Sequence, residues 1–287
     1  MCSIATKATM NLSKLRELQK TSERIAKEAG ALLLKYAGSS FNAREKAKFD
    51  LVTDADIASN KFISDQLRKE WPDSLVLAEE DGVPVEKLLK NAGHAEVLWI
   101  VDPLDGTTNF AKHVPHYAVV IAAYNPQTKE ILTGCIYDPW RKECFTAIKG
   151  QGAKLNGKRI RASGVNDFHF AMAATGFSYS RRKGDDNNLA ELAPFAQKCL
   201  ALRRYGAASL DLAWVACSRY DIYWESWLSP WDVCAGILIV REAGGMVSSF
   251  SREPSTPFDN NILATCTPLH QKALKQIRKA REKAGLK

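Results

Sequence analysis

Two carboxylates stand three residues apart in the segment Trp99–Phe110, which reads WIVDPLDGTTNF. The apolar run Leu98 to Val101 predicts a buried strand, and the proline and glycine that follow predict a turn. Asp102 and Asp105 would then emerge on one side of that turn. Hard divalent cations such as Mg²⁺ take oxygen ligands and keep water for a substrate, so this pair outlines a metal site.

A phosphate site is predicted beside the metal. Gly106 allows a sharp reversal before a possible helix start at Thr107 and Thr108. The unpaired amides at a helix N-terminus favour an anion. The pattern Asp-Pro-x-Asp-Gly is also ordinary turn chemistry, so this segment alone does not decide between a plain turn and a site.

Two further acidic positions border apolar segments. Glu79 follows the run Leu75 to Leu77, and Asp232 precedes the run Val233 to Val240. Taken singly, an acid at such a boundary is typical of a helix cap or a solvated side chain. Together with the aspartate pair, these positions could converge on one cation.

An ordered set of motifs carries a family resemblance. The motifs are Asp50–Asp56 (DLVTDAD), Glu79–Glu80, Asp102–Phe110, Gly206–Ala208 and Trp231–Gly236 (WDVCAG). In this order they resemble the inositol monophosphatase family, within the wider group of Mg²⁺-dependent, lithium-sensitive sugar phosphatases. The ordered set is far more specific than a lone Asp-Gly turn. The resemblance implies a mixed α/β fold, a layered αβαβα sandwich of the inositol monophosphatase and fructose-1,6-bisphosphatase type.

The resemblance also implies a centre that holds two or three Mg²⁺ ions and uses water as the nucleophile, without a covalent enzyme intermediate. Clustered carboxylates ionise together only when cations neutralise them, and such cations make water a better nucleophile. By resemblance, Glu79 and Thr107 position the attacking water, while Asp56 assists an additional metal and orients Thr107. The implied metal ligands are Glu79, Asp102, Asp105, Asp232 and the carbonyl oxygen of Leu104.

The implied substrate is inositol monophosphate or a similar small polyol or sugar phosphate. Thr108 and Asn109 resemble the inositol monophosphatase branch, and Glu225 matches the position that accepts hydrogen bonds from inositol hydroxyls. Inhibition by Li⁺ is expected on the same ground. The implied substrate contacts are Gly106, Thr107, Thr108, Gly206, Ala207, Ala208, Glu225 and Asp232.

Other activities of the same fold stay open: fructose-1,6-bisphosphatase, NADP phosphatase and histidinol-phosphate phosphatase. Arg181, Arg182 and Lys183 lie in a predicted loop and could reach a second phosphate. Trp227 stands where the family usually has glycine, so an indole there either changes the loop path or shapes one wall of the pocket. The alternative of another class is a non-catalytic regulatory or RNA-associated member. The retained carboxylates favour the enzyme, because an inactive scaffold has no need of clustered negative charge.

Composition sets the remaining expectations. The chain has 287 residues, 46% hydrophobic and 25% charged, which is ordinary for a globular protein. Its seven cysteines form no CxxC pair and are expected to be free thiols, mostly in the core. Basic residues give a net charge of +8 but are scattered over predicted helix surfaces, so we expect no nucleic-acid partner. We further expect a cytoplasmic homodimer without a membrane segment.

The elements that must position these residues follow from periodicity. Apolar residues at helical spacing predict a first helix that ends at Gly38, and Ala55 to Leu67 predicts a second. Strands are expected over 117–124, 130–137, 143–149, 171–176 and 221–225, and helices over 189–199, 209–217, from 231 and from 268. We expect an α+β domain over residues 1–150 with most metal ligands, and an α/β domain over 151–287 with Asp232 and the substrate contacts.

Overall fold

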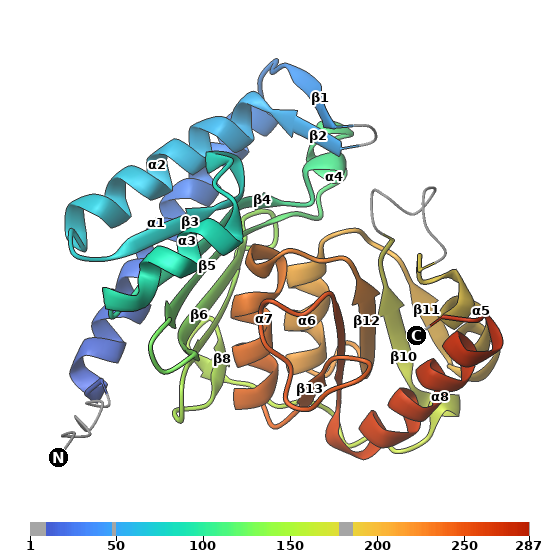
Figure 1. Cartoon of the computed structure of the whole chain (residues 1–287). Coiled ribbons are helices and arrows are strands. Elements are labelled where there is room, and N and C mark those ends of the chain that lie inside the picture. Colours follow the sequence, from blue (N-terminus) through green and yellow to red (C-terminus); the bar gives the residue numbers. More distant parts are fainter. Residues whose placement is uncertain (1–9, 48–49, 178–185, 287) are drawn as a thin grey trace, which may run out of the picture.

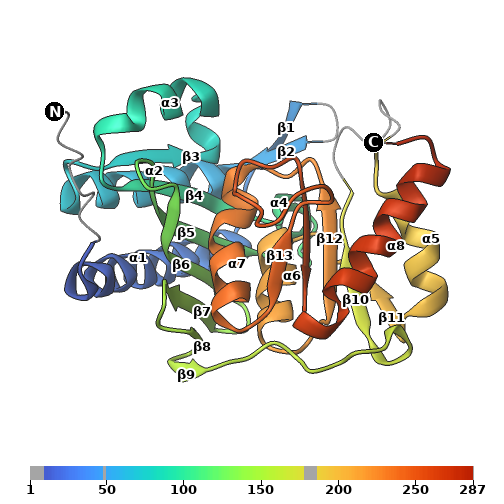
Figure 2. The same cartoon turned by 60° about the horizontal axis from the view of Figure 1, so that its bottom comes forward.

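The structure is a computed structural model that describes residues 10–47, 50–177 and 186–286. Its elements form five layers, in the order helices, sheet, helices, sheet, helices (Figures 1 and 2). The predicted αβαβα sandwich is therefore confirmed.

The outer helix layer of the first half covers one face of a seven-stranded sheet. It consists of α1 (Leu12–Ala37) and α2 (Asp54–Glu70). Asn11 caps α1 by accepting from the amide of Lys14 at 2.9 Å, and the helix ends at Gly38, as predicted. The strands, in their order across the sheet, are β3 (Leu75–Ala78), β4 (Leu98–Asp105), β5 (Ala118–Asn125), β6 (Glu130–Asp138), β7 (Glu143–Ile148), β8 (Ala153–Leu155) and β9 (Lys158–Arg159).

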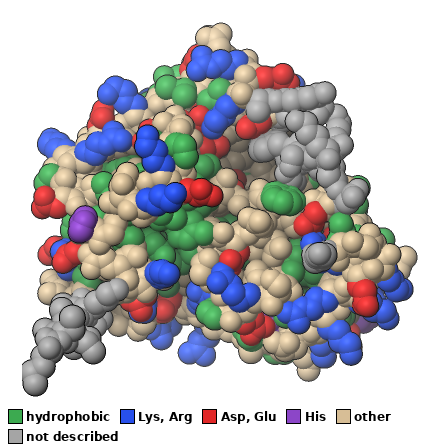
Figure 3. Space-filling model, viewed as in Figure 1, with side chains coloured by type: hydrophobic (Ala, Val, Ile, Leu, Met, Phe, Trp, Pro, Cys, Tyr) green, Lys and Arg blue, Asp and Glu red, His purple; other side chains and the backbone are tan. Residues whose placement is uncertain are grey.

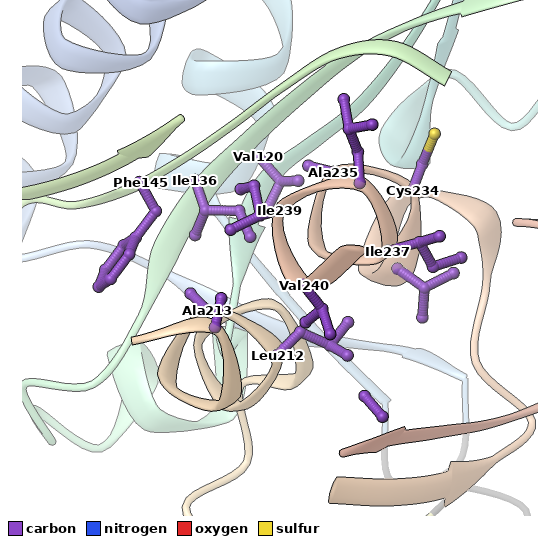
Figure 4. Packing of buried hydrophobic residues seen from close by; sticks show 14 of the residues in the cluster. Val120, Ile136, Phe145, Leu212, Ala213, Cys234, Ala235, Ile237, Ile239 and Val240 are labelled. Carbon is purple, nitrogen blue, oxygen red and sulfur yellow. The ribbon is translucent and has the colours of Figure 1, made fainter. Parts of the chain in front are cut away.

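Two buried helices form the middle layer, between the two sheets: α6 (Ala208–Ala216) and α7 (Pro230–Glu242). Figure 4 shows α7 side chains such as Ile239 packed against the strands of the first sheet. A glycine makes this contact possible, because a Cβ at Gly134 of β6 would lie 2.9 Å from the carbonyl oxygen of Ala235. The middle layer is apolar on all sides, which is expected of a helix surrounded by protein.

The second sheet has five strands and carries the last helix layer on its outer face. The helices are α5 (Leu189–Lys198) and the basic α8 (His270–Lys283). The strands, in sheet order, are β11 (Ala201–Arg203), β10 (Met172–Thr175), β12 (Ile222–Ser226), β14 (Asn261–Thr265) and β13 (Met246–Ser248).

Short elements complete the fold. The hairpin of β1 (Ala43–Ala47) and β2 (Asp50–Thr53) lies beside α4 (Thr107–Ala111), while α3 (Val85–Asn91) lies between β3 and β4 in the chain. Single 3₁₀ turns span Glu79–Asp81, Ala92–His94, Phe168–Phe170 and Thr267–Leu269.

The predicted helices and strands are present, with ends that differ by a few residues. One difference matters for chemistry. The strand expected over Leu98 to Val101 continues as β4 to Asp105, and its pairing with β5 shifts register between Asp102 and Asp105. Pro103 lies inside this irregularity, where its missing N–H interrupts no regular ladder. The reversal comes only at Gly106, with φ +95°.

The described cysteines are free, and Cys135, Cys144, Cys234 and Cys266 are buried, as predicted. In the described part of the chain, no helix is both long and apolar enough to cross a membrane. Figure 3 shows lysines and arginines interspersed with acidic side chains over one face of the molecule. The division into domains at residue 150 stays a prediction.

Candidate active site

A cavity of about 330 Å³ is lined by residues of both halves of the chain. Its walls come from β4, α4, the turn after β3, the loop before α6, and the segment between β12 and α7. The predicted site residues that line it are Glu79, Asp102, Leu104, Asp105, Gly106, Thr107, Gly206, Ala208, Glu225 and Asp232. The fold thus brings together acids that are up to 153 positions apart (Glu79 to Asp232) in the sequence.

Backbone amides fix one oxygen of each buried aspartate. The amide of Leu104 donates to Asp102 Oδ1 at 3.0 Å, across the strand irregularity. The amide of Ser209, in the first turn of α6, donates to Asp105 Oδ2 at 2.8 Å, and the serine hydroxyl bonds to the same oxygen. Helix N-termini favour such a carboxylate.

Asp232 is held by the start of its own helix. The amide of Ser229 donates to Asp232 Oδ2 at 2.6 Å, which is half of a capping box at the N-terminus of α7. Because Ser229 precedes Pro230 at the first helical position, the sequence SPWD marks this helix start. The helix therefore begins with its acid turned toward the cavity.

Glu79 begins the 3₁₀ turn after β3 and meets a lysine from the β1–β2 hairpin. Lys46 Nζ lies 3.4 Å from Glu79 Oε1 and 2.8 Å from Glu80 Oε1. Burial is the main cause that raises the pKa of Glu79 to about 7, and Lys46 only partly offsets it. Lys46 therefore offsets part of the negative charge of Glu79 and Glu80.

The pKa values of the three cavity aspartates are raised as well. Burial, then repulsion from Glu79 and from Asp105, raises the pKa values of Asp102 and Asp232 well above their ordinary range. Burial also raises the pKa of Asp105, although the Ser209 hydrogen bonds oppose it. Such a set of groups becomes fully ionised only when positive charge enters the cavity.

The donor set fits Mg²⁺. It consists of carboxylate oxygens and the Leu104 carbonyl, the hard ligands that Mg²⁺ prefers, and no thiol or imidazole lines the cavity among the described residues. Without a metal, the described side chains do not form a closed cluster of three or more ligands.

Asp56 stands behind the cavity wall and holds Thr107. Asp56 Oδ1 accepts from Thr107 Oγ1 at 2.8 Å, and Asp56 Oδ2 accepts from the amide of Thr53 at 2.8 Å. The second bond belongs to a capping box at the start of α2. The aspartate is almost fully buried, and burial raises its pKa to about 6. The pairing of Asp56 with Thr107 expected from the sequence is present.

Glu225 lies at the end of β12 and closes another side of the cavity. Tyr223 Oη donates to Glu225 Oε2 at 2.6 Å, and burial raises the pKa of this acid to about 7. Gly176 leaves room for the carboxylate, because a Cβ there would lie 1.9 Å from Glu225 Oε2. Glu225 is therefore a buried acid with one hydrogen-bond donor and a space that the fold leaves for it. It is not a solvated side chain at a strand end.

Three predicted residues do not line the cavity. Asp56 contacts it only through Thr107, Thr108 is exposed on α4, and Ala207 is fully buried before α6. Arg181, Arg182 and Lys183 lie outside the described residues.

Sequence reasoning missed several lining residues. Lys46, Phe177 and Arg204 contribute side chains to the cavity, and none of them stands in a recognisable motif. Ser209 and Ser229 hold the aspartates, and the capping pattern at Ser229 could have been found from sequence.

Comparison with known proteins agrees with this geometry. The model of the inositol monophosphatase family matches residues 14–285. Nus factor SuhB of Escherichia coli (strain K12) is 40% identical over 243 residues, which cover 84% of this chain and 88% of that protein.

Solved structures share the whole fold. Inositol monophosphatase from Anabaena (Nostoc) sp. PCC 7120 has a TM-score of 0.82 at 35% identity, covering 93% of this chain and 97% of that one. The extragenic suppressor protein suhB from Bartonella henselae has a TM-score of 0.83 at 34% identity, covering 92% and 99%. An IMPase/NADP phosphatase complexed with Mg²⁺ and phosphate is only 21% identical, with a TM-score of 0.78 over 92% and 95% of the chains, so it shows the fold alone.

The relatives correct one expectation. The prediction that the chain has no nucleic-acid partner is wrong, because relatives at 40% identity over most of both chains are named as a Nus factor. That prediction rested on scattered basic residues and the absence of a nucleic-acid motif. Neither excludes a nucleic acid that is recognised by its shape or bound within a protein complex.

The matched residues 14–285 include every motif that lines the cavity, and relatives of 34–40% identity cover most of the chain. The protein belongs to the inositol monophosphatase family.

Proposed function

We propose that the protein is a Mg²⁺-dependent phosphomonoesterase that hydrolyses inositol monophosphate, or a similar small polyol or sugar phosphate, to the alcohol and inorganic phosphate. The observation that carries this proposal is the convergence of Glu79, Asp102, Asp105 and Asp232 on one cavity from separate elements. Their raised pKa values show that burial and mutual repulsion disfavour ionisation, so the ionised acids need positive charge to neutralise them. Cation binding supplies that neutralisation.

In this proposal the carboxylates and the Leu104 carbonyl hold the metal, and Mg²⁺ when bound supplies the positive charge that lowers the pKa of water and balances the phosphate. The amides that begin α4 face the phosphate, where the N-terminal ends of peptide dipoles favour an anion.

Glu79 and Thr107 orient the attacking water in this scheme. Thr107 already donates its hydroxyl hydrogen to Asp56, so its oxygen lone pairs are available to accept from water. Glu79 would take the water proton as the new P–O bond forms and pass it to solvent, and the alcohol oxygen would gain a proton from solvent as its bond to phosphorus breaks.

The substrate's own hydroxyls would be read by Glu225. Its carboxylate is an acceptor with one oxygen engaged by Tyr223, and the other oxygen remains for the ligand. Gly206 and Ala208 also line the cavity, and their small size leaves room for a compact ring.

A panel assay tests the proposal. Phosphate release is measured with inositol 1-phosphate, fructose 1,6-bisphosphate, histidinol phosphate and NADP, with Mg²⁺ or with EDTA. We expect Mg²⁺-dependent release that is greatest with a monophosphate of a hydroxyl-rich ring. Activity on none of these esters, or activity that EDTA does not remove, contradicts the proposal.

A second function is favoured by the names of the relatives. We infer that the chain also acts in a transcription complex, as the name Nus factor SuhB suggests for proteins that are 40% identical. Co-elution with bacterial RNA polymerase in gel filtration, with and without RNA, tests this role. If wild type and Asp102→Asn co-elute equally, the role is independent of hydrolysis; failure of both to co-elute contradicts it.

A further inference from the structure

Trp227 adopts a backbone conformation that suits glycine. Its φ of +65° lies in the left-handed region, where a side chain with a Cβ costs free energy. The loop imposes this conformation, because the amide of Trp227 donates to the carbonyl oxygen of Asn260 at 2.5 Å. Glycine would adopt it without strain. The backbone conformation therefore does not favour an indole here, so the reason for one must lie in what its side chain contacts or binds.

The indole is exposed at the cavity and held in a fixed orientation. Trp227 lines the cavity wall and is 51% exposed. Its Nε1–H donates to the carbonyl oxygen of Asp186 at 2.8 Å. Arg281 in turn holds both carboxylate oxygens of Asp186, at 2.8 and 2.9 Å. A ring that is oriented before a ligand arrives loses little entropy on binding.

The surroundings of the indole differ from the carboxylate end of the cavity. Phe177 and Leu228 also line the wall, and the Arg204 guanidinium carbon lies 5.8 Å from the Phe177 ring centroid. Aromatic rings and a guanidinium offer flat faces rather than hydrogen-bond acceptors. A polyol can bond only to the guanidinium there, whereas a planar heteroaromatic ring can stack on the flat faces.

Chain length relates this surface to the sugar position. Trp227 follows Glu225 by two residues, so the chain separates their Cα atoms by at most about 7 Å. A ribose whose hydroxyls bond to Glu225 would carry its base toward the indole, while the phosphate stays at the carboxylate end. The two ends of the cavity thus match the two ends of a nucleoside phosphate.

We propose that Trp227 is a specificity-determining residue that stacks on a heteroaromatic base, so that this site prefers a nucleoside monophosphate to the same sugar phosphate without a base. The inference rests on the proposed phosphatase function and concerns one choice within it: among ribose phosphates, the site prefers those that carry a base. Phosphate ester hydrolysis is the same step as above, with water as the co-reactant.

The test compares esters with and without a base. The substrates are adenosine 2′-, 3′- and 5′-monophosphate, ribose 5-phosphate and inositol 1-phosphate, each assayed for kcat/KM with Mg²⁺. The variants are Trp227→Gly, which relieves the backbone strain, and Trp227→Phe, which keeps a ring. Trp140→Ala is the matched control, because Trp140 is a similarly exposed tryptophan that does not line the cavity.

In wild type we expect the best adenosine ester to exceed ribose 5-phosphate. Trp227→Gly should lower the ratio of these two kcat/KM values by roughly tenfold or more, in line with loss of base stacking. Trp227→Phe should retain most of the ratio, and Trp140→Ala should retain all of it. A ratio that Trp227→Gly leaves unchanged overturns the inference.

A binding measurement separates this inference from the proposed function. If wild type hydrolyses none of the esters, the phosphatase proposal fails. Calorimetric titration with adenosine 5′-monophosphate then decides the role of the indole. Binding that Trp227→Gly weakens about tenfold supports stacking, and equal or undetectable binding in both proteins overturns it.

Discussion

Thr107 Oγ1 donates a hydrogen bond to Asp56 Oδ1 at 2.8 Å, although the two residues are 51 positions apart in the chain. Asp56 is fixed in turn by the start of α2, because the amide of Thr53 donates to its other oxygen. The orientation of the Thr107 hydroxyl is therefore set by the fold. The hydroxyl hydrogen of Thr107 is already used in this bond, so towards the cavity its oxygen can act only as an acceptor.

We expect Thr107→Ala to lower kcat by roughly tenfold to a hundredfold, since small misplacements of reacting groups have effects of this size. The Mg²⁺ concentration for half-maximal activity should change little, because the carboxylates are untouched. Steady-state kinetics over a Mg²⁺ titration separates the two effects. Thr267→Ala is the control, as its hydroxyl donates to Gly244 O outside the cavity lining. A change in metal affinity alone would make Thr107 a ligand rather than a positioning residue.

The acidic cavity predicts how the stability of the metal-free protein depends on pH. Burial raises the pKa of Glu79 from 4.5 to about 7 and that of Asp56 from 3.8 to about 6. Between the unfolded and folded values the folded protein binds more protons, so its stability falls as pH rises. Each unit of pKa shift corresponds to about 1.4 kcal/mol. We expect Tm in EDTA to drop by several degrees between pH 5.5 and 8.

Mg²⁺ should reverse this trend, because it binds the deprotonated carboxylates of the folded protein. The rise in Tm on adding Mg²⁺ should therefore be larger at pH 8 than at pH 5.5. Differential scanning calorimetry at both pH values provides the comparison. A Tm gain that is equal at the two pH values, or larger at the lower one, would argue against these acids as the metal site.

Li⁺ should inhibit the enzyme. A small monovalent ion can take one of the oxygen-lined positions but brings half the charge of Mg²⁺, too little to balance the carboxylates and the product phosphate. The assay is phosphate release from inositol 1-phosphate in LiCl at about tens of millimolar, a range that perturbs weak metal sites. NaCl of equal ionic strength is the control. Full activity in LiCl would place this protein in an insensitive branch of the family.

The close packing of α7 on β6 predicts a stability effect. A Cβ at Gly134 would lie 2.9 Å from the Ala235 carbonyl oxygen and 3.0 Å from Ala235 Cα, so backbone must move to accept it. Gly134→Ala should destabilise the protein by about 1–3 kcal/mol, the usual cost of overpacking. Gly164→Ala is the matched control, because a Cβ there has no atom within 4 Å. Urea unfolding midpoints measure both, and equal values would mean that the interface is looser than described.

Residue periodicity was enough to predict most of the fold. The helix that ends at Gly38 and the strands of the first sheet follow from apolar spacing and turn residues, which act locally. The family motifs then identified the acids around β4 as candidate metal ligands. The position of Glu79 beside Lys46 did not follow from spacing, because the β1–β2 hairpin carries the lysine across by tertiary contact.

Some features of the backbone could not be predicted from neighbouring residues in the sequence. The pattern around Asp102 and Asp105 predicted an early turn, but pairing with β5 extends the strand past Pro103. The φ of Trp227 could not be read from its residue type, since tryptophan rarely adopts positive φ. The side chain of Thr108 is exposed on α4 and does not line the cavity, so its expected contact with the substrate stays a prediction.

The central claim is that the clustered carboxylates hold the metal for hydrolysis, and Asp102→Asn tests it most directly. Asp102 is almost fully buried, and Glu79, Asp105 and Asp232 repel its charge. The measurement is phosphate release from inositol 1-phosphate over a Mg²⁺ titration, together with Tm in EDTA, for wild type and the variant. We expect activity to fall by about a hundredfold or more at every Mg²⁺ concentration, the scale of losing a key electrostatic group, while Tm stays equal or rises because repulsion is relieved. Unchanged Mg²⁺-dependent activity in a folded Asp102→Asn protein would contradict the account.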